Sequence, residues 1–225
     1  DILVQDGTSS DFRTSHSDGS RIRYHSSDPG TGYSNYWEVT RTDGTKYLYG
    51  STLNSRLTRN DATAPETYRW ALAEVIDLRG NSYRIEYLAD TDVADTIIYS
   101  TFIYPHRIYY SLHRGAGAMG ALQARRMVQF EWEERGSSLD NYDWPTSYRA
   151  GFKVQQRWRL ARIVTGIDSS GNDELQMGTS EVTRYYDFEY TPKTMPDDPA
   201  TADEDESRNP PFSQLRAIQR YGRGP

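Results

Sequence analysis

The sequence predicts an all-β protein made of antiparallel hairpins, arranged in an extended curved sheet system or a large sandwich with few or no helices. Three observations lead to this prediction. Polar and apolar side chains alternate along several segments, which is typical of strands that have one covered face. Asp-Gly and Gly-Asn pairs separate these segments, and such pairs favour the tight turns of hairpins. No long segment shows the 3.6-residue periodicity of an amphipathic helix.

The clearest alternation lies around residues 83–87, 128–133 and 182–190. In a half-buried strand, successive side chains point to opposite faces of the sheet. The side chains expected to face a core are therefore Tyr83, Ile85, Tyr87, Val128, Phe130, Trp132, Val182, Tyr186, Phe188 and Tyr190. Those expected to face solvent are Arg84, Glu86, Gln129, Glu131, Glu133, Glu181, Thr183, Asp187 and Glu189.

The dipeptides between the strands mark predicted hairpin turns, because both residues of such a pair tolerate the positive φ that these turns need. The segment from Trp37 through Asp43-Gly44 to Tyr47 and Tyr49 has the spacing of a complete hairpin. So does the segment from Trp70 through Gly80-Asn81 to Tyr87. Further turns are predicted at Asp6-Gly7, Asp18-Gly19 and Gly171-Asn172.

A weak internal repeat links two of these turns. Trp70 leads to an Asp-x-x-Gly-Asn turn at 77–81, and Trp158 leads to another at 168–172. Repeated hairpins of this kind stack into extended sheets. The second turn continues into Asp173-Glu174, which gathers oxygen ligands without the pattern of an EF-hand loop. A plain hairpin turn is the favoured interpretation of residues 168–174, and a calcium ion there is left open.

Three stretches do not alternate. Residues 115–126 mix helix-forming residues with three Gly, which predicts one or two helical turns or a loop. Residues 51–66 are polar and include Pro65, which predicts a short turn before Trp70. Residues 191–211 hold five Pro and the acidic run 203–206, which predicts an exposed, acidic, proline-rich loop. We interpret residues 1–225 as a single β region and, from the abrupt start and end, as a fragment of a larger protein.

Composition excludes several classes of function. The net charge is −6, from 26 basic and 32 acidic residues, whereas a nucleic-acid-binding protein needs a positive excess. The absence of cysteine excludes disulfides, thiolate metal sites and a cysteine nucleophile. No apolar run approaches the length of a membrane span, and the first residues have no basic region of the kind that opens a signal peptide. With 18 Tyr and 5 Trp, the core is expected to rely on large aromatic side chains.

No catalytic, cofactor or metal site is predicted. A Ser-His-Asp site needs a base within hydrogen-bonding reach of the nucleophile, and no Gly-x-Ser-x-Gly elbow is present. The separation of His106 and His113 is odd, which puts the two rings on opposite faces of a strand. The remaining histidines, His16 and His25, are interpreted as surface or loop residues. A glycosidase site needs two carboxylates at a defined distance in space. Spacing along the chain does not give this distance, so such a pair is left open.

Six blocks in order along residues 37–222 resemble a known family, the SpvB-type region. That region opens SpvB virulence proteins and the B components of Tc insecticidal toxin complexes. The blocks are strand-turn-strand patterns, and the ordered set is much more specific than any single block. The residues that carry the resemblance are Trp37, Asp43, Gly44, Tyr49, Gly50, Trp70, Asp77, Gly80, Asn81, Tyr87, Phe130, Arg135, Leu160, Tyr190, Leu215 and Gly222.

The resemblance implies a secreted, non-catalytic part of a bacterial toxin complex. Relatives of this kind resemble YD/RHS-repeat shells, in which long sheets enclose a toxic polypeptide. It implies a structural role, no cofactor, and two kinds of partner: other segments of the parent chain and other subunits of the toxin complex. The chain is far shorter than such proteins, and it carries neither an FG-GAP-type calcium loop nor an effector domain.

Two other functions are weighed against this one. SpvB carries an ADP-ribosyltransferase at its other end, and such enzymes need a Ser-Thr-Ser strand before a Glu-x-Glu loop. Here Glu131-Trp132-Glu133 lies within an alternating strand and precedes Gly178-Thr179-Ser180, which is the wrong order. The main alternative is a carbohydrate-binding β-sandwich, in which an exposed row of coplanar Trp and Tyr rings stacks on sugars. A shell fragment should instead show open sheet edges.

Overall fold

The computed structural model describes residues 3–16, 18–27, 34–60, 65–94, 97–113, 125–135, 144–191 and 213–222. Nearly all regular structure in these ranges is β-strand, which confirms the all-β prediction. One short 3₁₀ helix, η1 (Leu53–Ser55), accompanies the strands in the described ranges. No helix among these residues is long and apolar enough to cross a membrane.

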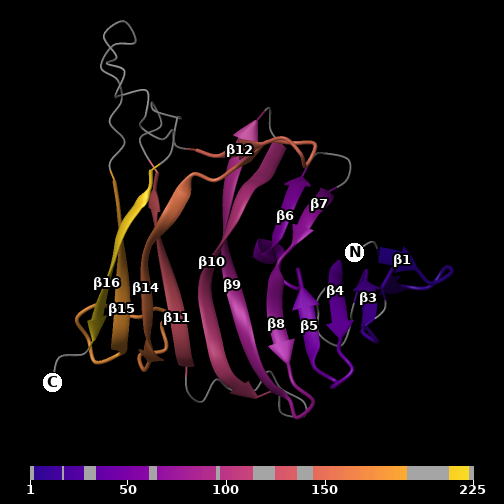
Figure 1. The fold of residues 1–225 in the computed structure, drawn as a ribbon, viewed down its shortest axis with the longest axis horizontal. Coiled ribbons are helices and arrows are strands. Elements are labelled where there is room, and N and C mark those ends of the chain that lie inside the picture. The colour runs from indigo at the N-terminus through magenta and orange to yellow at the C-terminus, as the bar shows by residue number, and fades with distance from the viewer. Residues whose placement is uncertain are drawn as a thin grey trace, which may run out of the picture.

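The described strands form one 14-stranded sheet and one small two-stranded sheet (Figure 1). Antiparallel neighbours follow the order β1-β2-β3-β4-β5-β8-β9-β10-β11-β14-β15-β16. The strands of this path are β1 (Leu3–Gln5), β2 (Asp11–Thr14), β3 (Arg21–His25), β4 (Tyr36–Thr40), β5 (Lys46–Tyr49), β8 (Leu72–Ile76), β9 (Asn81–Ala94), β10 (Ile97–His113), β11 (Arg125–Glu134), β14 (Trp158–Asp168), β15 (Val182–Tyr190) and β16 (Leu215–Gly222). Off the path lie β6 (Arg56–Asn60) and β7 (Pro65–Trp70), and the small sheet pairs β12 (Thr146–Ser147) with β13 (Val154–Gln155).

Of the two predicted arrangements, the structure has the extended sheet. Strands that pair in this sheet are mostly consecutive in the chain. Short turns make this order possible. At the β4–β5 turn, Gly44 has a φ of +82°, a conformation that side chains with a Cβ adopt at a cost. Asp43 Oδ1 accepts a hydrogen bond from Thr45 N at 2.9 Å. The two strands then pair so that Trp37 lies opposite Tyr49.

The hairpin β6–β7 lies outside the consecutive path, and the sequence did not predict its strands. Residues 51–66 were expected to hold only a short turn; η1 supplies that turn, and β6 follows at once. The reason is tertiary: Leu57 is 1% exposed and the guanidinium of Arg56 donates to the backbone oxygens of Gly50 and Ser34. Because β6 is stabilised by these tertiary contacts, the polar sequence of residues 51–66 does not predict a strand there.

The ring of Trp70, at the end of β7, packs edge-on against Trp37 with the ring centroids 6.1 Å apart. Its Nε1 donates to the backbone oxygen of Asn35 at 3.1 Å. The same ring leaves no room for a Cβ on Gly50, which has a φ of +70°. Both steric room and backbone conformation therefore require glycine at position 50.

The pairing between β10 and β11 covers only part of these two long strands. The two strands pair directly only from Arg107 to Tyr110. Beyond that segment, Tyr104 is fully buried and its ring lies 4.8 Å from Trp132 and 5.1 Å from Trp158. Side-chain packing thus adds to the short backbone pairing between β10 and β11.

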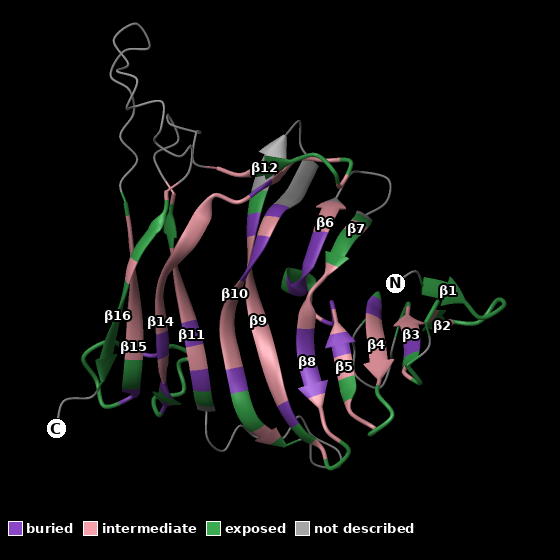
Figure 2. Cartoon of the chain, viewed as in Figure 1, coloured by how far each residue is buried: buried purple, intermediate pink, exposed green. Residues whose placement is uncertain are grey.

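The best-defined core cluster of the described residues comprises Tyr109, Met127, Val164, Leu175 and Val182. Figure 2 shows buried segments on β11 and β14. Two predicted segments lie outside the described residues: residues 115–124, expected to form helical turns or a loop, and residues 192–211 of the expected acidic loop. The last two residues of the 115–126 stretch begin β11.

Candidate interaction face

The register of the strands sorts the side chains of the sheet onto two faces, because directly opposed residues point to the same side. We name the charged face by the row Asp11, Arg23, Glu38, Leu48, Glu74, Arg84, Tyr109 and Met127. We name the apolar face by the alternating row Phe12, Ile22, Val39, Tyr47, Val75 and Tyr83, and by Ile85, Ile108, Val128, Phe130 and Ile163 farther along. Each face continues from β2 to β16.

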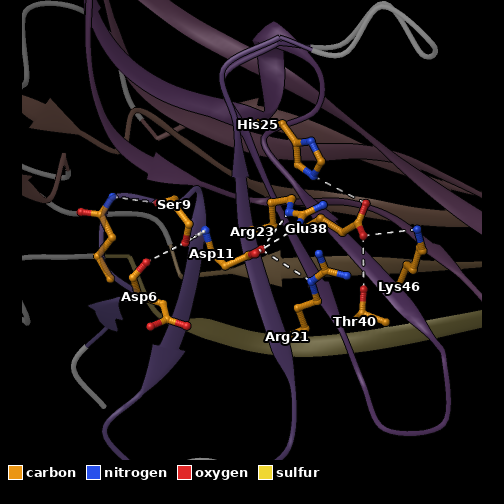
Figure 3. A network of polar contacts seen from close by, with 10 residues as sticks. Asp6, Ser9, Asp11, Arg21, Arg23, His25, Glu38, Thr40 and Lys46 are labelled. Carbon is orange, nitrogen blue, oxygen red and sulfur yellow. Dashed lines mark hydrogen bonds and ion pairs between the residues drawn. The ribbon is translucent and has the colours of Figure 1, made fainter.

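Ion pairs run across the charged face at its N-terminal end (Figure 3). Arg23 donates from Nε and from its terminal nitrogen to the two oxygens of Asp11, at 2.8 and 3.0 Å. This hydrogen-bonded contact with Arg23 holds the pKa of Asp11 below its usual value. Glu38 lies between Lys46 Nζ, at 3.2 Å, and His25 Nε2, at 3.7 Å. The carboxylates of this network are thus occupied by neighbouring cations.

The same arrangement returns at the C-terminal end of the charged face. Arg162 bridges Glu131 on one neighbouring strand and Asp187 on the other. Arg159 Nε lies 2.6 Å from a carboxylate oxygen of Glu133. The two carboxylates of the Glu-x-Glu sequence are therefore members of cross-strand ion pairs. Glu131 pairs with Arg162 and Glu133 with Arg159, so both contribute to holding β11 against β14.

Residues 169–181, between β14 and β15, fold over the charged face. Leu175, 2% exposed, enters the core cluster, and its backbone N–H donates to Gln129 Oε1 at 3.0 Å. Asp168 Oδ1 accepts from Gly171 N at 2.6 Å, and Glu181 accepts from the N–H groups of Ser169 and Ser170. The oxygen ligands that made this segment a calcium candidate thus form the internal hydrogen bonds of the loop.

This covering reverses the expected burial of β11. Val128, Phe130 and Trp132 were expected to face a core, yet Met127 and Gln129 are the buried side chains, at 0% and 4% exposure. The apolar row is only half-buried. The expectation of a solvent-facing Gln129 was wrong because residues 169–181 cover the face that the alternation assigns to solvent.

Val182 also departs from the expected pattern. Alternation grouped it with Tyr186 and Phe188, but the register shifts between Thr165 and Gly166. Val182 then pairs with Gly166 and joins the core cluster on the charged face. A bulge changes the side to which the following side chains point, so a period-two pattern fails across it.

The residues that carry the family resemblance occupy turns, pairings and packing contacts. In the turn before β9, Asp77 Oδ1 accepts from Asn81 N at 2.8 Å and Gly80 has a φ of +86°. Arg135 Nε lies 3.3 Å from the backbone oxygen of Trp158. The remaining contacts are Tyr87 Oη to Leu72 O, Tyr190 Oη to Leu160 O, and the register pairs Phe130–Ile163, Tyr190–Leu215 and Arg184–Gly222.

The four histidines do not come together. His25 stacks on Tyr36 with the ring centroids 4.5 Å apart, and His16 and His113 are exposed. Burial lowers the pKa of His106, and the adjacent Arg107 adds to the effect. Burial also raises the pKa of Tyr104 and of Tyr109 to about 12. These shifts arise from packing inside the sheet, and within the described residues no group of three metal-ligating side chains forms.

The aromatic rings pack mainly edge-on or tilted to one another. Phe12 and Tyr24 approach Trp37 at interplanar angles of 70° and 51°, and Trp132 approaches Tyr104 at 56°. The five Trp are half-buried. Two described ring pairs are stacked: His25–Tyr36 at 4°, and Tyr185–Tyr221 at 14° near the sheet edge. Edge-on packing is the arrangement that stabilises aromatic clusters, whereas sugar stacking uses flat, exposed rings.

A cavity of about 370 Å³ opens at the end of β15. Met177, Arg184, Tyr185 and Gly222 are among its lining residues. Its described lining residues include no Asp, Glu or His, which are the side chains that commonly supply acid-base catalysis.

Comparison with known proteins finds one matching family model and several similar solved structures. Residues 13–101 match the family model described as SpvB, Salmonella virulence plasmid 65kDa B protein. No curated protein matches the sequence. Among solved structures, the chain is similar to the N-terminal domain of the effector protein SpvB from Salmonella typhimurium strain LT2. The TM-score is 0.64 and the identity 17%, over 95% of this chain and 69% of that one.

The chain is also similar to parts of much longer proteins. TcdB2-TccC3 gives a TM-score of 0.59 at 18% identity, over 93% of this chain and 11% of that chain. The Tc holotoxin pore of Photorhabdus luminescens gives a TM-score of 0.59 at 18% identity, over 93% and 10%. These structural likenesses show the fold. Together with the family match, they confirm the resemblance to the SpvB-type and Tc toxin N-terminal region.

Proposed function

We propose that this chain is a non-catalytic structural part of a secreted bacterial toxin complex, which helps to enclose or dock a toxic partner polypeptide. The observation that carries the proposal is the edge strand β16. It runs for eight residues from Leu215 to Gly222, and among the described strands it pairs with β15 alone. Figure 1 places β1 and β16 at opposite ends of the sheet.

Free domains usually blunt such edges with lysines, prolines or very short strands. β1 is short, at three residues, whereas β16 is long and has neither lysine nor proline, its charged residues being Arg216 and Arg220. It exposes Leu215, Ile218 and Tyr221 at 50%, 55% and 38%. A long edge with exposed apolar side chains suits a sheet that continues into further strands. We therefore infer partners among other segments of a parent chain and other toxin-complex subunits.

The absence of catalysis is inferred from the use of the candidate groups. Glu131 and Glu133 each form an ion pair with an arginine of β14. Asp168 and Glu181 accept the hydrogen bonds of residues 169–173. A catalytic carboxylate needs access to substrate and a pKa suited to proton transfer. Glu131 and Glu133 are thus used in ion pairs between strands, and Asp168 and Glu181 in hydrogen bonds that form the loop.

The test blocks the edge of β16 with charge. The chain is coexpressed with the segments that follow it in its reading frame and with the toxin subunits encoded beside it. We expect a complex that elutes as one species and protects the partner polypeptide from trypsin. Replacing Leu215 and Ile218 by Lys should remove complex and protection together, because charged residues disfavour edge pairing.

The matched control replaces two apolar residues exposed far from this edge, Leu53 and Leu78, at 81% and 80% exposure. Leu53→Lys/Leu78→Lys should assemble like the unaltered chain, and all variants should melt at a similar temperature. Assembly that survives the β16 substitutions, or specific binding of the chain to a glycan array, would overturn the proposal.

A further inference from the structure

Three arginines on the apolar face stand apart from the others in the sheet. Arg126 on β11, Arg184 on β15 and Arg220 on β16 are exposed, and none pairs with a carboxylate of a described residue. On the charged face, by contrast, Arg23, Arg159 and Arg162 each contact at least one acid. These three arginines thus lie on one face at the C-terminal end of the sheet, whereas other exposed arginines without a described acidic partner, such as Arg13 on β2 and Arg69 on β7, lie on distant strands.

The register places these arginines on the same side. Arg184 lies opposite Thr165, which lies opposite Val128; Arg126 is two residues from Val128 on the same strand. Arg220 lies opposite Tyr186, two residues from Arg184. Neighbouring strands are about 4.8 Å apart and alternate side chains about 7 Å apart. From Arg126 to Arg220 the surface therefore extends about 14 Å across the strands and about 13 Å along them.

Apolar side chains fill the space between the cations. Tyr110, Ile167 and Ile218 are 37%, 45% and 55% exposed. The half-buried residues beside them are Val128, Phe130, Ile163, Tyr186 and Phe188. We call Arg126, Arg184 and Arg220, together with Tyr110, Ile167 and Ile218, the basic patch. The core cluster lies on the opposite face, so among the described residues no core packs against this patch.

We propose that the basic patch binds an extended, acidic polypeptide segment that also carries apolar side chains. Its carboxylates pair with Arg126, Arg184 and Arg220, and its apolar side chains cover the exposed Ile and Tyr between them. This inference rests on the proposed function, since it specifies the chemistry of the partner that the sheet docks. Arginine suits this role because its guanidinium matches a carboxylate geometrically and packs on aromatic rings.

The surroundings favour a polypeptide over a nucleic acid. Nucleic-acid binding depends on many phosphate contacts and a positive field, whereas this chain has a net charge of −6. The patch holds three cations separated by aliphatic residues such as Ile167 and Ile218. Alternating carboxylates and apolar side chains on an extended segment match this surface in both charge and hydrophobicity.

The test uses the whole chain and synthetic extended peptides. The first peptide alternates Glu with Val, the second Lys with Val, and the third Glu with Ser. We expect the Glu-Val peptide to bind and its affinity to fall with salt, because exposed charge pairs are screened. The Lys-Val peptide should not bind, and the Glu-Ser peptide should bind more weakly because it buries no apolar surface. A single-stranded oligonucleotide of equal charge tests the other polyanion.

Two triple variants test the location. Arg126→Gln/Arg184→Gln/Arg220→Gln should weaken binding of the Glu-Val peptide about tenfold, as expected from the loss of three exposed charge pairs. The control, Arg13→Gln/Arg79→Gln/Arg149→Gln, removes the same charge at exposed positions elsewhere and should bind like the unaltered chain. Comparable melting temperatures establish that both variants are folded.

The outcomes separate this inference from the proposed function. Equal losses in the two triple variants, or no binding of the Glu-Val peptide, overturn the acidic-segment proposal. Preference for the oligonucleotide overturns it in favour of nucleic acid, and a concentration-dependent dimer lost in the patch variant overturns it in favour of a second copy. Ile218 belongs to both surfaces, so assembly through β16 is also scored with Leu215→Lys alone, which leaves the basic patch unchanged; the proposed function stands or falls on that substitution.

Discussion

The turns at residues 77–81 and 168–172 share one sequence pattern and have different structures. In the first, Asp77 N donates to Asn81 O at 2.9 Å, and β9 begins at Asn81. In the second, residues 169–181 intervene before β15 begins at Val182. The Asp side chain organises both turns by accepting backbone N–H bonds. We call Asp77 and Asp168 the anchors of the two turns. An anchor of the same kind therefore does not determine how many residues separate the turn from the next strand.

The side chains around the anchor account for the difference. Leu78 in the tight turn is 80% exposed, whereas Leu175 in the long loop is 2% exposed and packs in the core cluster. Two residues before the anchor, the tight turn has Val75 and the long loop has Gly166. The backbone oxygen of Glu181 occupies the space that a Cβ of Gly166 would need. The long loop depends on glycine before the turn and leucine after it.

The largest effect is expected when Gly166 is replaced by valine, the residue that precedes the first turn at the equivalent position, Val75. Gly166→Val should destabilise the protein by about 4 kcal/mol or more, because its Cβ would collide with backbone that cannot rotate away. The measurement is urea unfolding. Ile167→Val, at the next and exposed position, is the control and should change stability by less than about 0.5 kcal/mol. A folded Gly166→Val protein of normal stability would contradict the close approach of the loop.

The two leucines provide the next test. Leu175→Ala should cost about 3 kcal/mol, because it leaves a cavity among Tyr109, Met127, Val164 and Val182. Leu78→Ala should cost less than about 0.5 kcal/mol, because that side chain is largely in solvent. Hydrogen exchange of β11 and β14 amides should rise in Leu175→Ala alone. Equal losses in the two variants would show that the loop does not contribute to the core.

The anchors themselves should differ in importance. Asp168 is 5% exposed and accepts from Gly171 N, Asp173 N and Ser170 Oγ. Asp168→Ala should cost about 2 kcal/mol, since it leaves these donors without an acceptor in a covered site. Asp77→Ala should cost less, because water replaces the lost acceptor in an exposed turn. Thermal unfolding of both variants gives the ranking, and the opposite order would mean that the tight turn is the more demanding one.

The smallest effect concerns acid. Hydrogen bonds from Ser169 and Ser170 hold the pKa of Glu181 below its usual 4.5. A pKa lowered by folding stabilises the native state above the unfolded pKa, and this contribution disappears as the pH falls through the lowered value. Glu181→Gln should therefore reduce stability at pH 7 and flatten its decline below about pH 4.5. Urea midpoints across this range measure both; an unchanged acid limb would contradict the role of the carboxylate.

The prediction of strands and turns succeeded where the governing interactions are local. Gly44 and Gly80 have the positive φ that their dipeptides predict, at +82° and +86°. Alternation located the strands around residues 83–87, 128–133 and 182–190. Polar residues 56–60 gave no such signal, because β6 is stabilised by the burial of Leu57 and by the carbonyl partners of Arg56.

Alternation by itself determined that β11 has one apolar and one polar face, because side chains of a strand point to its two sides in turn. Only the tertiary structure decided which face is covered. Leu175, 46 residues from Gln129, donates to that glutamine and buries it. The apolar row with Val128 and Phe130 is left half-exposed beside Arg126. Period-two order is a property of neighbouring residues, whereas coverage depends on where a distant segment packs.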